Sequence, residues 1–103
     1  MKYDVKITVM KREFYPELAQ EVIEQPFGPC DKFIDAQEFI IDNINKYPEK
    51  FCPWAWADIQ RDVAMILYGA TPEPLLKNPH SIYVCCDEGI RPVIFKIERI
   101  ILE

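Results

Sequence analysis

The chain has 103 residues, a formal net charge of −5 and a hydrophobic content of 50%. This length suits a single domain over residues 1–103, which would bury enough surface for one modest core. The acidic balance argues against nucleic-acid binding, because phosphate recognition needs clustered Lys and Arg side chains. The first residues do not resemble a secretory signal, and no apolar run approaches the ~20 residues of a membrane span. We therefore expect a cytoplasmic protein without a membrane partner.

The apolar content also bears on assembly. Aromatic residues make up 13% of the chain, which is more than so small a domain readily hides. Because exposed apolar patches on small proteins often mark contacts with another copy, we expect a homo-oligomer.

The N-terminal half predicts two strands and a short helix. Apolar and polar residues alternate from Lys2 to Val9, which is the pattern of a half-buried strand. Pro16 suits the first turn of a helix that runs to about Ile23, with Leu18, Val22 and Ile23 on its apolar side. A second strand is expected over residues 37–42, after an irregular Pro-rich segment.

The strongest helical pattern runs from about Pro53 to Tyr68 and is stopped by Gly69. Its apolar face, at 3- and 4-residue steps, consists of Trp56, Ile59, Val63, Ile66 and Leu67. A second stripe consists of Trp54, Asp58, Arg61, Met65 and Tyr68. This stripe is too aromatic for an ordinary solvated face, so Trp54, Met65 and Tyr68 are candidates for a subunit interface.

The C-terminal part predicts a further helical turn over residues 71–73 and two strands over 81–86 and 92–102, joined by a turn at 87–90. The expected fold class is α+β. A small, mainly antiparallel sheet of about four strands would pack against one long helix and one or two short helices.

The four cysteines all fall at predicted element boundaries: Cys30, Cys52, Cys85 and Cys86. In a reducing compartment they are better explained as free thiols, metal ligands or a redox pair than as structural disulfides. Cys52 precedes Pro53 and would be the N-cap of the long helix, where the positive end of the helix dipole favours a thiolate. The alternative is that Cys52 is a small buried residue among aromatic neighbours.

Cys85 and Cys86 are adjacent, so in a regular strand their side chains point to opposite faces. Only one of them can then join a given site, and the simplest assignment places Cys86 toward the core and exposes Cys85. Both could converge if the strand ended early. Arg91, just beyond the turn, could support a thiolate or bind an anionic ligand, or it could pair with Asp87 or Glu88 on the surface.

The cysteine spacing contains no CxxC or CxxH motif and matches no zinc-ribbon or ferredoxin pattern. Folding could still bring Cys30, Cys52 and one of the paired cysteines together. With His80 as a distant fourth ligand, such a thiolate-rich site would suit zinc or an iron–sulfur cluster. The same thiols could serve redox exchange instead, and a lone loop histidine such as His80 is usually only solvated.

Three motifs together resemble an uncharacterised family of small four-cysteine prokaryotic proteins: GPC at residues 28–30, FCPWAW at 51–56 and CCDEGIRPVIFKIER at 85–99. The resemblance covers essentially the whole chain but implies no reaction. It implies that the family's characteristic positions are Cys30, Cys52, Asp58, Cys85, Cys86, Arg91 and Arg99. Glu88 departs from the Asp expected before the glycine, which matters little because the turn depends on the glycine.

Two functional hypotheses follow, and a third stays open. The first is a thiol-based metal-binding or redox module in which clustered cysteines lie near Arg91, Asp58 and His80. The second is a non-enzymatic oligomeric interaction protein whose cysteines are packing residues. The third is a small-molecule enzyme with a pocket between subunits that contains Arg91 and Asp58.

Overall fold

The computed structural model describes residues 2–71 and 77–102, and these form four strands and two helices. In chain order the elements are β1 (Lys2–Arg12), α1 (Pro16–Val22), β2 (Glu38–Ile41), α2 (Pro53–Leu67), β3 (Ser81–Cys85) and β4 (Val93–Leu102). The predicted α+β class is confirmed. The helical turn predicted over residues 71–73 falls largely outside the described residues.

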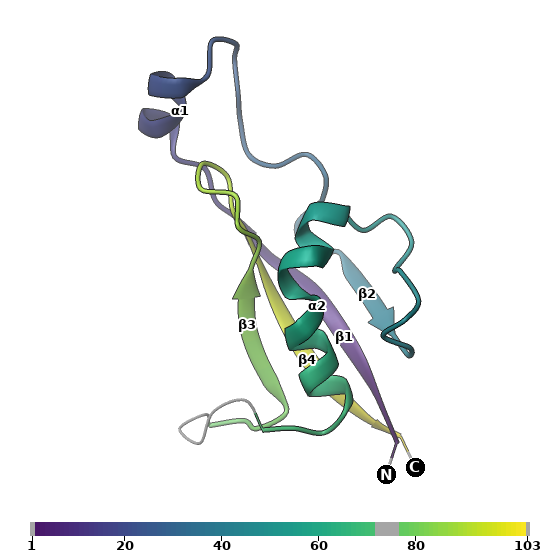
Figure 1. The fold of residues 1–103 in the computed structure, drawn as a ribbon. Coiled ribbons are helices and arrows are strands. Elements are labelled where there is room, and N and C mark those ends of the chain that lie inside the picture. The colour runs from purple at the N-terminus through teal and green to yellow at the C-terminus, as the bar shows by residue number, and fades with distance from the viewer. Residues whose placement is uncertain (1, 72–76, 103) are drawn as a thin grey trace.

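The four strands form one antiparallel sheet with the order β2-β1-β4-β3 (Figure 1). The two longest strands, β1 and β4, lie at its centre. Strand β1 continues three residues beyond the predicted end at Val9, because after a register shift between Val9 and Lys11 it resumes pairing with β4 up to Arg12. This extension carries Arg12 toward the loop that contains Cys30.

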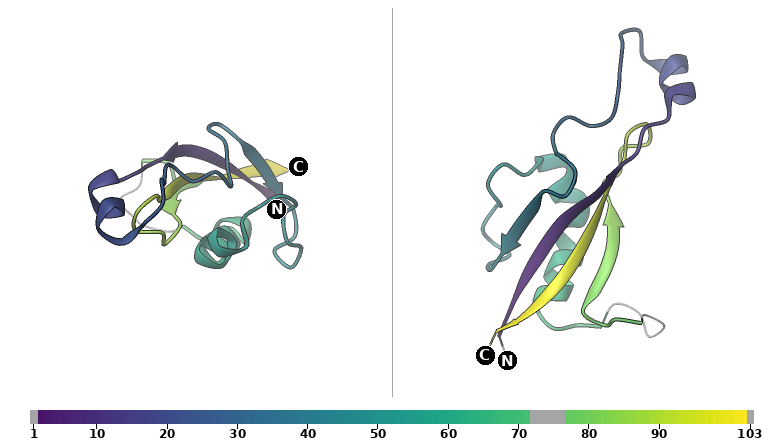
Figure 2. Two further views of the ribbon diagram at one scale, coloured as in Figure 1. Left: turned by 90° about the horizontal axis from the view of Figure 1, so that it is seen from above. Right: turned by 180° about the vertical axis from the view of Figure 1, so that it is seen from behind.

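Helix α2 packs on one face of the sheet, as the view from above shows (Figure 2). All five residues of the predicted apolar face are buried: Trp56, Ile59, Val63, Ile66 and Leu67. They meet buried residues of the two central strands, among them Val5, Ile7, Phe95 and Ile97. Each such large apolar side chain contributes about 1.5–3 kcal/mol by leaving water. This core fixes α2 against the sheet.

Both ends of α2 agree with the prediction. Cys52 is the N-cap residue and Pro53 begins the helix. At the other end the Gly69 N–H donates to the Ile66 carbonyl at 3.2 Å and the Ala70 N–H donates to the Met65 carbonyl at 3.0 Å, which is a Schellman motif. Gly69 adopts a φ of 89°, a left-handed conformation that side chains disfavour.

Helix α1 ends at Val22, close to the predicted end at about Ile23. Leu18 and Val22, which the spacing placed on one side of the helix, are exposed, and Ala19 is its buried residue. The physical reason is visible in Figure 1, where α1 lies away from the sheet at the end of an extended arm, so no core faces it. Neither helix within the described ranges has the length and apolar character of a membrane span.

Candidate functional site

A cavity of about 530 Å³ lies where α2 begins, β3 ends and β4 starts. Its lining includes three thiols, Cys30, Cys52 and Cys86, and five charged side chains, Lys32, Asp58, Asp87, Glu88 and Arg91. The apolar part of the lining consists of Phe33, Trp54, Ala55, Ala57 and Val93. This volume is in the range of small-molecule sites. The cavity therefore combines room for a ligand with sulfur chemistry.

Each thiol reaches the cavity from a different segment. Cys30 comes from the loop between α1 and β2, Cys52 is the N-cap of α2, and Cys86 follows the last residue of β3. All three are free and half-buried, and all three pack against the edge of the core. The Cys30 Sγ accepts a hydrogen bond from the Lys32 backbone N–H at 3.4 Å. Three segments far apart in the chain thus each contribute a cysteine to the lining of one cavity.

The environment of Cys86 keeps it in the thiol form. Burial raises the pKa of Cys86, and negative charge on Cys30 and Asp58 raises it further. Hydrogen bonding acts in the opposite direction, since the Val93 N–H donates to the Cys86 Sγ at 3.3 Å. Burial is the largest of these effects.

Cys85 and His80 do not line this cavity. Cys85 is the exposed last residue of β3, because the strand alternates and Cys86 takes the side that faces the core. His80 precedes β3, so the length of the strand, about 20 Å at 3.3 Å per residue, separates it from Cys86. There its Nδ1 lies 3.1 Å from the Arg99 guanidinium. Neither residue is placed to act with the three clustered thiols.

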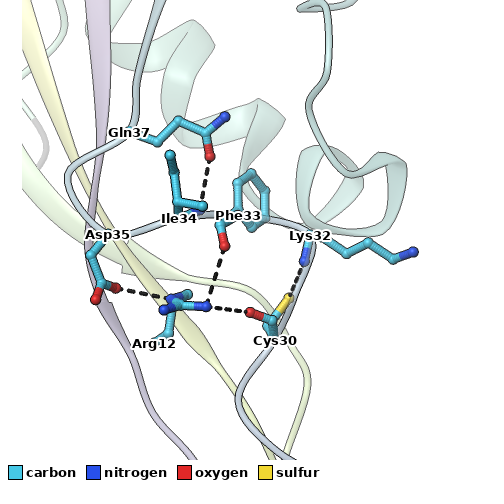
Figure 3. Close-up of polar contacts among 7 residues, drawn as sticks. All are labelled: Arg12, Cys30, Lys32, Phe33, Ile34, Asp35 and Gln37. Carbon is cyan, nitrogen blue, oxygen red and sulfur yellow. Dashed lines mark hydrogen bonds and ion pairs between the residues drawn. The ribbon is translucent and has the colours of Figure 1, made fainter.

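Arg12 fixes the loop that carries Cys30 (Figure 3). Its guanidinium donates to the Cys30 carbonyl at 2.9 Å, to the Phe33 carbonyl at 3.4 Å and to the Asp35 carboxylate at 2.9 Å. The hydrogen bond with Asp35 raises the pKa of Arg12, so the cation persists at any physiological pH. One planar donor group thereby ties the end of β1 to both ends of a short loop.

We expect the Arg12→Gln substitution to speed alkylation of Cys30 by roughly threefold to tenfold, because a loop that loses its anchoring hydrogen bonds opens more often. The rate is measured by iodoacetamide labelling and peptide mass spectrometry of the native protein. Lys11→Gln is the matched control, since it changes the same charge at an exposed neighbouring position. Equal Cys30 rates in the two variants would show that Arg12 does not hold the loop.

Some charged side chains of the cavity accept hydrogen bonds from the backbone, and others form no ion pair in the described part of the chain. The Asp58 carboxylate accepts the Asp87 backbone N–H at 2.7 Å, and the Glu88 carboxylate accepts the Ile90 N–H at 3.1 Å. These two acids therefore shape the turn between β3 and β4. The Arg91 guanidinium lies over the Phe27 ring, 4.1 Å from its centroid. Within residues 2–71 and 77–102, neither Arg91 nor Lys32 forms an ion pair, so the surface pairing of Arg91 with Asp87 or Glu88 is not observed.

The three candidate interface residues lie along α2 in different surroundings. Trp54 is 81% exposed and forms part of the cavity wall near the start of the helix. Met65 is half-buried, and Tyr68 is 70% exposed at the C-terminal end of the helix. The stripe thus presents two large aromatic side chains to the surface.

The cavity does not provide the ligands of the predicted metal site. A thiolate-rich zinc or iron–sulfur site needs several ligands around one point. In the described part of the chain, no group of three or more His, Cys, Asp or Glu side chains could hold a metal ion. The predicted zinc or iron–sulfur site therefore lacks a matching ligand set there.

Two residues near the thiols were not among the candidates from sequence. Lys32 lines the cavity, and its position two residues after Cys30 was a usable signal. Arg12 had no such signal, because its partners lie 18 to 23 residues away and meet it only after folding.

No protein-family model matches the sequence, and neither a curated protein nor a solved structure is significantly similar to it. The functional inference therefore depends on the geometry of the cavity.

Proposed function

We propose that this protein is a cytoplasmic thiol–disulfide exchange module that uses Cys30 and Cys86 as its redox pair. The observation that carries the proposal is that thiols from three separate segments line one cavity large enough for a small molecule. We take Cys30 and Cys86 as the pair because, of the other two cavity thiols, Cys30 is the one whose charge raises the pKa of Cys86. Cys52 is a third thiol of the same cavity.

Redox chemistry suits this cavity better than metal binding does. Exchange needs only two thiols that can meet, whereas a structural or catalytic metal needs at least three protein ligands around one point. The described residues offer thiols that share a cavity but no such ligand group.

The reaction consumes a small disulfide as its oxidant. The Cys30 thiolate attacks one sulfur of the small disulfide, the S–S bond breaks, and the first small thiol leaves and takes up a proton. Cys86 then loses its proton and attacks the sulfur of Cys30, which releases the second small thiol. The two protein thiols are oxidised by two electrons, and the small disulfide is reduced to two thiols. The first attack is assigned to Cys30 because burial raises the pKa of Cys86 and so disfavours the Cys86 thiolate.

The test exposes fully reduced protein to bis(2-hydroxyethyl) disulfide under native conditions. We expect a Cys30–Cys86 cross-link in the peptide map, with two equivalents of 2-mercaptoethanol released by this pair in addition to one for each other thiol that forms a mixed disulfide. The exposed Cys85 is an internal reference, because it can form only a mixed disulfide that releases one equivalent. In the Cys52→Ser/Cys85→Ser double variant, two released equivalents without any retained adduct in the intact-protein mass report the intramolecular step. Absence of any cross-link among Cys30, Cys52 and Cys86 would reject the proposal.

A second candidate function has its own supporting observation. Trp54 and Tyr68 are strongly exposed aromatic side chains on α2, and such residues are enriched at protein interfaces. In this alternative the protein is a homo-oligomeric interaction protein and its cysteines serve packing. Unreactive thiols in an oligomer that dissociates on Trp54→Ala substitution would favour it over redox exchange.

A further inference from the structure

We propose that the cavity accepts small disulfides that bear a carboxylate, with Arg91 as the group that binds this carboxylate. The inference rests on the proposed exchange function and names its substrate class. Arg91 lines the same cavity as the three thiols, so a ligand bound to it would place its sulfur atoms among them. A guanidinium is well suited to this task, since its planar donors match both oxygens of a carboxylate.

The placement of Arg91 leaves its donors available. The face of the guanidinium rests on the Phe27 ring, and this contact restricts the side chain without using its N–H groups. Within the described ranges, Arg91 forms neither an ion pair nor a side-chain hydrogen bond. The guanidinium is thus held by stacking while its hydrogen-bonding capacity stays unused. Such an arrangement fits a binding group better than a structural one.

Three carboxylates and two cations line the cavity, so its formal charge is −1 and any preference for an anion must come from Arg91 and Lys32 themselves. Asp58 and Glu88 each accept a backbone N–H within the turn, so part of their capacity is already used. Lys32 is a second cation of the lining that forms no ion pair in the described part of the chain. Arg91 and Lys32 are therefore the groups to which a ligand carboxylate can bind, against the repulsion of the carboxylates of Asp58, Asp87 and Glu88.

The negative net charge of the protein separates long-range electrostatics from binding in the cavity. At −5 the chain repels anions at long range, so a preference for an anionic disulfide must come from the local cavity. Three disulfides of similar size differ in charge: 3,3′-dithiodipropionate is a dianion, bis(2-hydroxyethyl) disulfide is neutral, and cystamine is a dication. Each rate of the first exchange step is divided by the rate of the same disulfide with a free cysteine derivative, which removes differences in intrinsic reactivity.

We expect the normalised rate for the dianion to exceed that for the neutral disulfide by about tenfold, the effect of one charge-assisted hydrogen bond at a partly exposed site. Arg91→Gln should lower the normalised rate for the dianion by about tenfold and so abolish this preference. Arg61→Gln is the matched control, because Arg61 is exposed on α2 and does not line the cavity. An equal preference in the Arg91→Gln variant and the unmodified protein would overturn the assignment.

A second measurement separates this inference from the exchange function. Suberate has the length and charge of 3,3′-dithiodipropionate but no disulfide, so it can bind without reacting. Its dissociation constant is followed by backbone amide shifts of the β3–β4 turn in NMR titrations. Binding that weakens about tenfold in Arg91→Gln, but not in Arg61→Gln, supports the carboxylate site even if the thiols prove unreactive. Suberate binding that is absent, or unaffected by Arg91→Gln, overturns it.

Discussion

Replacing Arg99 by Met is expected to lower the free energy of unfolding by about 2–4 kcal/mol, because several carbonyl groups lose a buried charged donor. Arg99 lies in β4 and is only 9% exposed. Its Nε donates to the Ile66 carbonyl at 2.7 Å, and its Nη2 donates to the Ala70 carbonyl at 2.5 Å. The last carbonyls of a helix have no partner within the helix and carry its negative dipole end. Arg99 therefore fastens the C-terminal end of α2 to the sheet.

Urea denaturation of the two proteins measures this difference. Lys96→Met is the matched control, since Lys96 lies in the same strand on the opposite face and, within the described residues, its charge pairs with the half-buried Glu98 at 3.6 Å. That control should cost no more than about 0.5–1 kcal/mol. Arg99→Lys should recover only part of the loss, because an ammonium group cannot reach several carbonyls in fixed directions at once. Equal unfolding free energies for Arg99→Met and Lys96→Met would contradict this role for Arg99.

The parts of the fold that could be predicted are those fixed by local patterns. Alternation identified β1, and the 3.6-residue period together with Pro53 and Gly69 identified α2 and both of its ends. Helix α1 shows where such patterns fail. Its apolar spacing was real, but spacing states only that residues share a side and not that a core lies opposite them. The exposure of Leu18 and Val22 depends on the position of the whole arm.

The same distinction applies to the candidate site. Strand alternation was enough to separate Cys85 from Cys86, and helix start signals were enough to place Cys52 at an N-cap. The separation of His80 from the thiols was not predicted, although the strand that lies between His80 and Cys86 was. In contrast, the hydrogen bond from Arg12 to the Cys30 carbonyl and the stacking of Arg91 on Phe27 are tertiary contacts. No spacing along the chain specifies such contacts.

The Cys86→Ser substitution is expected to stop the exchange reaction after its first step, at the mixed disulfide on Cys30. In the Cys86→Ser variant Cys30 still attacks the small disulfide, but Cys86, the thiol that displaces the second small thiol from it, is missing. A stable mixed disulfide on Cys30 should therefore accumulate, and one equivalent of small thiol fewer should be released. Both quantities are read by intact-protein mass spectrometry and a thiol assay. Cys85→Ser is the matched control, because Cys85 is the adjacent exposed thiol and lies outside the cavity.

The unmodified protein offers an independent check through pH. Because burial raises the pKa of Cys86, only a small fraction is thiolate near neutral pH, and the second step depends on that fraction. Its rate should rise by about tenfold per pH unit and keep rising beyond pH ~9, where an ordinary cysteine of pKa ~8.5 levels off. A second step that levels off at or below that pH, or a Cys86→Ser variant that releases the full amount of small thiol, would show that another cysteine completes the exchange. Cys52 would then be the remaining thiol of the cavity to examine.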